Sequence, residues 1–182
     1  EQILIRRKRV LTFEERKKIN DSLFVKDYDY WRFINIFFHS GCRRTELCGL
    51  KVSDVNLTNQ VFTVLVKKGR QHKEQLRAIK NIAFPFWKEQ LCGGKPDDFV
   101  FSSNLNPGKF KLQPKIISYR WKEYVKDDLK IDVDFYALKH LNLDETSNQL
   151  NAEAAAKMAG HTSTVITLKH YLVNEEQREL DK

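Results

Sequence analysis

The stretch Tyr30-Trp-Arg-Phe-Ile-Asn-Ile-Phe-Phe-His39 is apolar nearly all round. A surface helix carries a single apolar stripe, so this composition predicts a helix buried in the core. Ser40-Gly41 follows at once and predicts the end of that helix. With 182 residues, of which 41% are hydrophobic, the chain is long enough to bury such a core as one domain.

Capping and spacing signals on both sides of this stretch predict a mainly helical chain. Thr12-Phe-Glu-Glu15 has the spacing of a capping box, which predicts a helix from there to about Phe24. Further helices are expected from Thr45 and Glu46 through Leu50, from Phe84-Pro85 through about Leu91, over residues 113–127 and 135–144, over residues 152–159 between Asn151 as cap and Gly160 as stop, and from Thr162 or Ser163 onward.

The middle of the chain changes to a β pattern. Residues 61–66 and 76–82 are β-prone runs that flank the basic segment Lys67-Lys-Gly-Arg-Gln-His-Lys73. This order predicts an antiparallel hairpin with a basic, glycine-containing turn. Residues 99–101 form a candidate short strand, and residues 102–113 are expected to be a loop. The predicted fold class is therefore α+β, mainly helical with a small antiparallel sheet.

The charge balance favours a polyanionic partner. Lys and Arg number 32 against 24 Asp and Glu, for a net charge of +8. The cysteines, Cys42, Cys48 and Cys92, are odd in number and lack ligand spacing, so they indicate neither a disulfide framework nor a zinc site. Because no apolar run approaches the ~20 residues of a membrane span and no signal peptide is visible, we expect a cytoplasmic protein without a membrane partner.

The first ten residues differ from the rest. The run Arg6-Arg-Lys-Arg9 predicts that residues 1–10 form a basic linker or arm, either a solvated tail or a segment that contacts a nucleic-acid backbone. Residues 11–182 are expected to form one domain. The chain opens at Glu1 rather than Met, which suggests a fragment whose N-terminal neighbour is missing.

The segment Gly160-His-Thr-Ser-Thr-Val-Ile-Thr-Leu-Lys-His-Tyr171 combines a helix stop, a histidine and a tyrosine ten residues after that histidine. Such an arrangement can deliver a phenol to a phosphate, although a tyrosine near a chain end is more often a packed aromatic. Cationic side chains upstream would favour the interpretation that Tyr171 meets a phosphate. Arg43 and Arg44 stand beside a predicted helix end, where Glu46 would orient a guanidinium, or where the pair forms a surface salt bridge.

Four motifs together resemble a known family. They are Gly41-Cys-Arg43-x-x-Glu46-Leu47, the lysine hairpin, Tyr136-Ala-Leu-Lys139-His140, and Gly160-His161 followed by Tyr171. Their order is that of the catalytic domain of tyrosine recombinases, the phage integrase family, and they span nearly all of the chain. The chain looks most like integrases of mobile elements, in which Tyr-x-Leu-Lys-His can replace His-x-Leu-Arg-His. The resemblance implies the recombinase catalytic-domain fold for residues 11–182, with an N-terminal DNA-clamping domain outside this chain.

The resemblance implies a transesterification that needs no metal and no cofactor. Tyr171 would attack a DNA phosphodiester, which leaves a 3′-phosphotyrosyl link and a free 5′-hydroxyl. Fixed cations would stabilise the negative charge that develops on the phosphate oxygens. Arg43 matches the family's first arginine, and Lys139 stands where the second arginine usually lies, so that position keeps a charge but loses the planar fork.

The remaining site residues follow from the same resemblance. Tyr136 replaces a histidine and could donate a hydrogen bond but not act as a base near neutral pH. His161 matches the later histidine, and it is a candidate donor to the phosphate or a partner for Tyr171. Lys68 would be the general acid for the 5′-oxygen, with Lys67 as the alternative one residue away. The residues expected to contact DNA are Arg44, Lys67, Arg70, Lys73 and His140. The hairpin lysines could instead be solvated residues that protect a sheet edge. His140 could instead be a structural neighbour of the site.

The expected partners are double-stranded DNA, three further copies of the chain in a tetramer on DNA, and accessory DNA-bending proteins at a bacterial nucleoid. The interval from His161 to Tyr171 is one residue longer than usual in the family, which leaves the placement of Tyr171 open. A catalytically silent, DNA-binding relative is therefore the alternative, and a basic structural protein with coincidental motifs is a third. The sequence does not distinguish integration, excision and dimer resolution, or reveal the DNA site.

Overall fold

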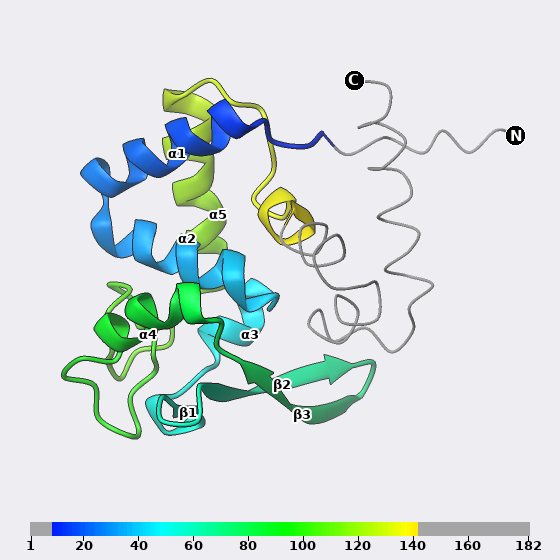
Figure 1. Ribbon diagram of the computed structural model, residues 1–182. Helices are drawn as coiled ribbons and strands as arrows, with labels where there is room; N and C mark the ends of the chain where they lie inside the picture. The colour runs from blue at the N-terminus through cyan, green and yellow to red at the C-terminus, as the bar shows by residue number, and fades with distance from the viewer. Residues whose placement is uncertain (1–8, 142–182) are drawn as a thin grey trace, which may run out of the picture.

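The computed structural model describes residues 9–141, so the expected basic run at 6–8 and the helices expected beyond residue 141 lie outside the described residues. Figure 1 shows helices gathered on one side of a small sheet. The elements are α1 (Phe13–Lys26), α2 (Tyr28–Ser40), α3 (Arg44–Cys48), η1 (Val52–Asp54), β1 (Val55–Asn56), β2 (Val61–Lys68), β3 (Gln71–Ala78), η2 (Asn81–Ala83), α4 (Phe84–Gln90), α5 (Pro114–Trp121) and η3 (Lys122–Asp128). This confirms the predicted α+β class.

The first two helices begin with side-chain caps. In α1 the Thr12 hydroxyl accepts a hydrogen bond from the backbone N–H of Glu15, and the Glu15 carboxylate accepts one from the N–H of Thr12, both at 3.1 Å. This is the predicted capping box, and the helix runs to Lys26, two residues beyond the predicted end. Asp27 then caps α2 by accepting from the N–H of Tyr30 at 3.0 Å. One residue thus ends one helix and starts the next.

The helix α2 is the centre of the core, as its sequence predicts. Phe33 and Ile36 are fully buried, and α2 ends at Gly41, whose φ of 67° is the left-handed conformation that glycine adopts without strain. The Phe33 ring packs edge-on against Phe101 at 4.9 Å, and Phe37 lies 4.4 Å from Phe135. Distant parts of the chain therefore converge on this helix.

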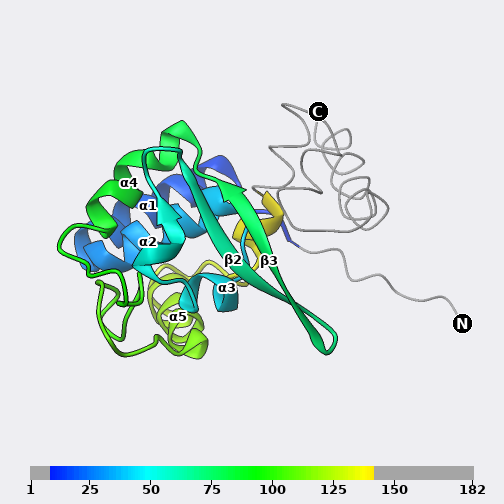
Figure 2. The same cartoon turned by 90° about the horizontal axis from the view of Figure 1, so that it is seen from below.

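The three-stranded antiparallel sheet has the order β1-β2-β3. The hairpin is confirmed, but the predicted seven-residue turn over residues 67–73 is wrong. In the structure β2 continues to Lys68, β3 starts at Gln71, and only Gly69-Arg70 connects them. Figure 2 shows this hairpin reaching beyond the helical body. Residues 71–74 are all exposed, so no core imposes apolar alternation on them, and the backbone ladder alone marks the strand.

Two smaller predictions need correction. The helix α3 ends at Cys48 rather than Leu50. Residues 99–101 do not form a strand, because Phe99 makes only isolated bridges to Lys51 and Gly108. The helical segment predicted over residues 113–127 is confirmed, and it consists of α5 followed directly by the π-helical segment η3.

Candidate active site

The corner between α2 and α3 holds Arg43 and Glu46. The Glu46 carboxylate accepts a hydrogen bond from the backbone N–H of Arg43 at 2.7 Å, and its Oε1 lies 3.6 Å from Nη1 of the Arg43 guanidinium. The Glu46 side chain is 6% exposed, whereas that of Arg43 is 45% exposed. A buried carboxylate therefore tethers a guanidinium that remains open to a ligand, which agrees with the expected orienting role of Glu46.

Lys139 lies in the same cluster, on the last described helical turn. It is only 6% exposed. Burial lowers the pKa of its ammonium below the ordinary value; Glu46 opposes this shift, while the positive charges of Arg43 and Arg77 add to it. These interactions place Lys139 near the α2–α3 corner and the sheet. The structure thus brings together the two residues that the motifs identify as the site's principal cations.

Arg77 is a member of this cluster that the sequence analysis missed. It lies on β3 opposite Phe62, is 5% exposed, and donates from Nη2 to the Gln75 side-chain oxygen at 3.1 Å. Its charge acts on both Lys139 and the buried thiol of Cys42. No local pattern identifies it, because arginine is rarely buried, and the apolar surroundings of Arg77 come from Phe62 and Val64 on the neighbouring strand β2.

Tyr136 lies one helical turn before Lys139 and is half-buried. Its backbone carbonyl accepts from the N–H of Lys139 at 3.1 Å and from that of His140 at 3.3 Å. The guanidinium carbon of Arg44 lies 5.5 Å from the Tyr136 ring centroid, and Arg44 also donates to the Ser118 hydroxyl on α5. DNA contacts by Arg44 and by the half-buried His140 stay predictions.

The hairpin presents its cations to solvent. Lys67, Arg70 and Lys73 are exposed, and Lys68 pairs through its backbone with Gln71. The side chain of Lys68 is not among those described, so the choice between Lys68 and Lys67 as general acid stays open. His161 and Tyr171 also lie outside the described residues.

Within residues 9–141, no three His, Cys, Asp or Glu side chains are grouped to hold a metal ion. Burial raises the pKa of the Cys42 and Cys48 thiols to about 12, which makes them poor nucleophiles. None of the helices described is long and apolar enough to cross a membrane.

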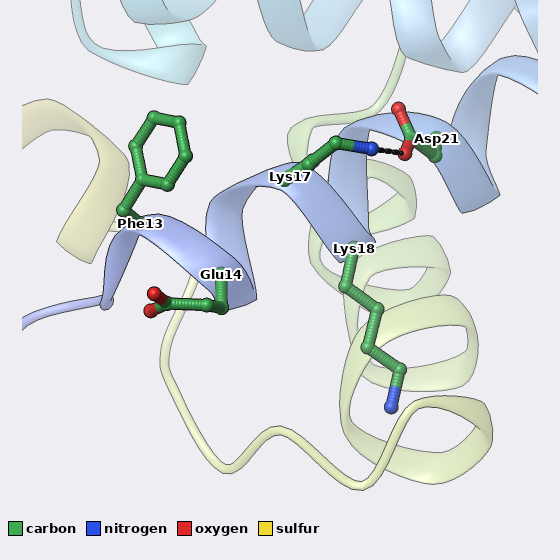
Figure 3. Close-up of a pocket in the computed structure, with 5 residues that line it drawn as sticks. All are labelled: Phe13, Glu14, Lys17, Lys18 and Asp21. Carbon is green, nitrogen blue, oxygen red and sulfur yellow. Dashed lines mark hydrogen bonds and ion pairs between the residues drawn. The ribbon is translucent and has the colours of Figure 1, made fainter.

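A hollow of about 390 Å³ lies on the surface of α1, away from the Glu46 cluster in sequence and element. Figure 3 shows that it is open and that Lys17 and Asp21 pair across one edge, 2.6 Å apart. Its lining is a single exposed helix face rather than an enclosed site. It carries no candidate chemistry.

The family comparison decides the identity of this arrangement. The family model described as the phage integrase family matches residues 9–178. The chain belongs to the phage integrase family. A tyrosine recombinase of Thermosipho africanus (strain TCF52B) is 28% identical over 151 residues, covering 81% of this chain and 50% of the relative. A probable integrase/recombinase of Acholeplasma phage L2 is 25% identical over 182 residues, covering 91% of this chain and 55% of the relative.

Solved structures of integrases and recombinases share this fold. The crystal structure of XerA recombinase superposes with a TM-score of 0.74 at 18% identity, covering 97% of this chain and 65% of that one. A lambda integrase tetramer bound to a Holliday junction gives 0.69 at 19% identity, covering 90% and 48%. The phage integrase chain described here spans about half the length of the curated relatives it matches.

The buried charge of Lys139 leads to a stability prediction. Its pKa is lowered from 10.5, so between the folded-state pKa and 10.5 the unfolded chain binds more protons, and stability rises with pH there. Replacing Lys139 by Met is expected to stabilise the fold at neutral pH by about 1 kcal/mol or more. That gain in unfolding free energy should shrink as the pH rises toward 10.5. Urea unfolding at a series of pH values measures it. Lys88→Met, on an exposed position of α4, should show no such trend; a pH-independent effect of Lys139→Met would contradict the assignment.

Proposed function

We propose that the chain is the catalytic domain, over residues 11–182, of a site-specific DNA recombinase of the integrase type. It cuts and rejoins DNA strands through a 3′-phosphotyrosyl intermediate, and its substrates are the ends of a mobile element. The observation that carries this proposal is the cluster around Glu46, where Arg43, Lys139 and Arg77 outnumber one carboxylate. Such an excess of fixed positive charge suits a phosphate whose oxygens gain negative charge during reaction.

Each residue has a defined part in the proposed reaction. The Tyr171 hydroxyl loses its proton, and the resulting phenolate oxygen forms a bond to phosphorus while the bond from phosphorus to the 5′-oxygen breaks. Lys68, or Lys67, donates a proton to the leaving 5′-oxygen. Arg43 offers its planar fork to the phosphate oxygens. Tyr136 and His161 donate further hydrogen bonds, and Lys139 supplies a point charge in a nearly water-free position.

The proposed partners follow from the same chemistry. Exposed Lys67, Arg70 and Lys73 on the protruding hairpin suit the backbone of double-stranded DNA, with His140 near the cluster. A tetramer on DNA is supported by the lambda integrase tetramer, which is bound to a Holliday junction. Accessory DNA-bending proteins and a place at the bacterial nucleoid complete the proposal.

A second candidate is a DNA-binding relative that has lost catalysis. It is favoured by Lys139 in place of an arginine, by Tyr136 in place of a histidine, and by the ten-residue interval from His161 to Tyr171. It binds DNA in a salt-sensitive manner but forms no covalent link to it. The two candidates therefore differ in whether a covalent link between the protein and DNA forms.

Relaxation of a supercoiled plasmid separates these candidates without knowledge of the target site. Cleavage through Tyr171 leaves a 5′-hydroxyl end that rotates before the strand is rejoined, so relaxed closed circles should form without ATP and in excess EDTA. Tyr171→Phe should abolish relaxation. Tyr119→Phe, which changes an exposed tyrosine on α5, is the matched control and should relax at the wild-type rate. Salt-sensitive binding without relaxation by the wild type would favour the silent relative.

A further inference from the structure

Arg44 ties together three segments that lie beside the proposed site. It is the first residue of α3 and directly follows Arg43. Its guanidinium donates a hydrogen bond to the Ser118 hydroxyl on α5, and its carbon lies 5.5 Å from the ring centroid of Tyr136. Tyr136 in turn accepts the N–H of Lys139 through its carbonyl at 3.1 Å. One side chain thus reaches both the helix α5 and the turn that carries Lys139.

The environment of Arg44 differs from that of its neighbour Arg43. Arg44 is half-buried, and its Nε is buried without a hydrogen-bond acceptor among the described residues. The Arg43 side chain is instead 45% exposed beside its carboxylate. A guanidinium that is already held by a hydroxyl and a ring face is poorly placed to reach a DNA backbone. It is well placed to fix the ring.

We propose that Arg44 is a positioning residue that holds the phenol of Tyr136 toward the scissile phosphate. This inference rests on the proposed function, because it assigns a task to Tyr136 in that reaction. A cation over the face of an aromatic ring is attracted by the ring quadrupole, and the attraction grows as water is excluded. The guanidinium also donates a hydrogen bond to Ser118, which fixes its position, so it limits the movement of the Tyr136 ring.

The same geometry accounts for a tyrosine at position 136. An imidazole there would become a cation when protonated, and the guanidinium of Arg44 would repel that cation and lower the pKa of the histidine. A phenol donates a hydrogen bond without carrying charge. Arg44 and Tyr136 therefore act as a matched pair, in which the cation orients the donor.

The test is a double-mutant cycle on the rate of plasmid relaxation. Arg44→Met should slow relaxation about tenfold, a typical coupling for side chains in contact. Tyr136→Phe keeps the ring but removes the hydroxyl, so Arg44→Met should cause no further loss in that background. If Arg44 instead contacted a phosphate, Arg44→Met would lower the salt dependence of DNA binding by about one charge, as Arg70→Gln is expected to do. The positioning role predicts that Arg44→Met leaves the salt dependence unchanged.

A second readout does not depend on catalysis. With 3-fluorotyrosine at position 136, Arg44→Met should shift or broaden the fluorine resonance, and Arg43→Met should leave it nearly unchanged. An unchanged resonance in Arg44→Met overturns the pair whether or not the plasmid is relaxed. Equal slowing by Arg44→Met in the wild-type and Tyr136→Phe backgrounds also overturns it. Failure of the wild type to relax the plasmid overturns the proposed function instead, so the two failures are distinct.

Discussion

Replacing Arg43 by alanine is expected to slow DNA strand cleavage by about 10²–10³-fold, the usual loss when one fixed donor to a developing oxyanion is removed. The guanidinium is the most exposed cation of the Glu46 cluster, and the Glu46 carboxylate lies 3.6 Å from its Nη1. Two donors in one plane match two phosphate oxygens, and alanine supplies neither. The rate of plasmid relaxation under single-turnover conditions measures this loss.

The fold should tolerate this substitution. Glu46 keeps the hydrogen bond from the backbone N–H of residue 43, and the positive charge of Lys139 still interacts with its carboxylate. Arg43→Lys restores the charge without the fork, so its rate should lie between those of the wild type and the alanine variant. Wild-type relaxation by a folded Arg43→Ala protein would remove Arg43 from the proposed chemistry.

Arg32→Met is expected to cost about 3 kcal/mol of unfolding free energy, because it breaks a buried charged network. Arg32 lies on α2 with a side chain only 6% exposed, and it donates from Nε to Gln90 at 2.7 Å. Its other nitrogens bind Asp29 at 3.0 Å and Asn106 at 2.9 Å, and lie 3.2 Å from Glu89. The arginine therefore joins α2 to α4 and to the loop at Asn106.

The size of this effect depends on what the partners do afterwards. Asp29 and Glu89 are 40% and 47% exposed and regain water, so the cost should fall at the lower end of the range for buried pairs. Urea unfolding measures it. The control is Lys17→Met, which breaks the exposed pair with Asp21 and should change stability by less than about 1 kcal/mol. Equal effects of the two variants would contradict a structural role for the Arg32 network.

Local signals in the sequence predict the helices well. The structure confirms the capping box at Thr12 and the buried helix over residues 30–39. Both depend only on residues that are neighbours along the chain. The hairpin is different, since residues 71–74 face solvent on both sides of the strand and carry no alternation. Its length is set by the pairing of Lys68 with Gln71, which is a contact between strands.

The same distinction applies to the site. The motifs identify Arg43 and Lys139, and the structure brings both to Glu46. Arg77 could not be found by hydrophobicity, because Leu76 is 68% exposed whereas Arg77 is 5% exposed, the reverse of the usual preference. Placement of a buried arginine requires knowledge of the charges that converge on it from other elements, which no local pattern contains.

The residue that becomes linked to DNA tests the central claim most directly. Protein caught on supercoiled plasmid by rapid denaturation would be digested with nuclease and protease, and the modified peptide identified by mass spectrometry. The account predicts a nucleotide joined through its 3′-phosphate to Tyr171, and no adduct from Tyr171→Phe. A nucleotide on Tyr136 or on any residue other than Tyr171, or relaxation without an adduct, would contradict it.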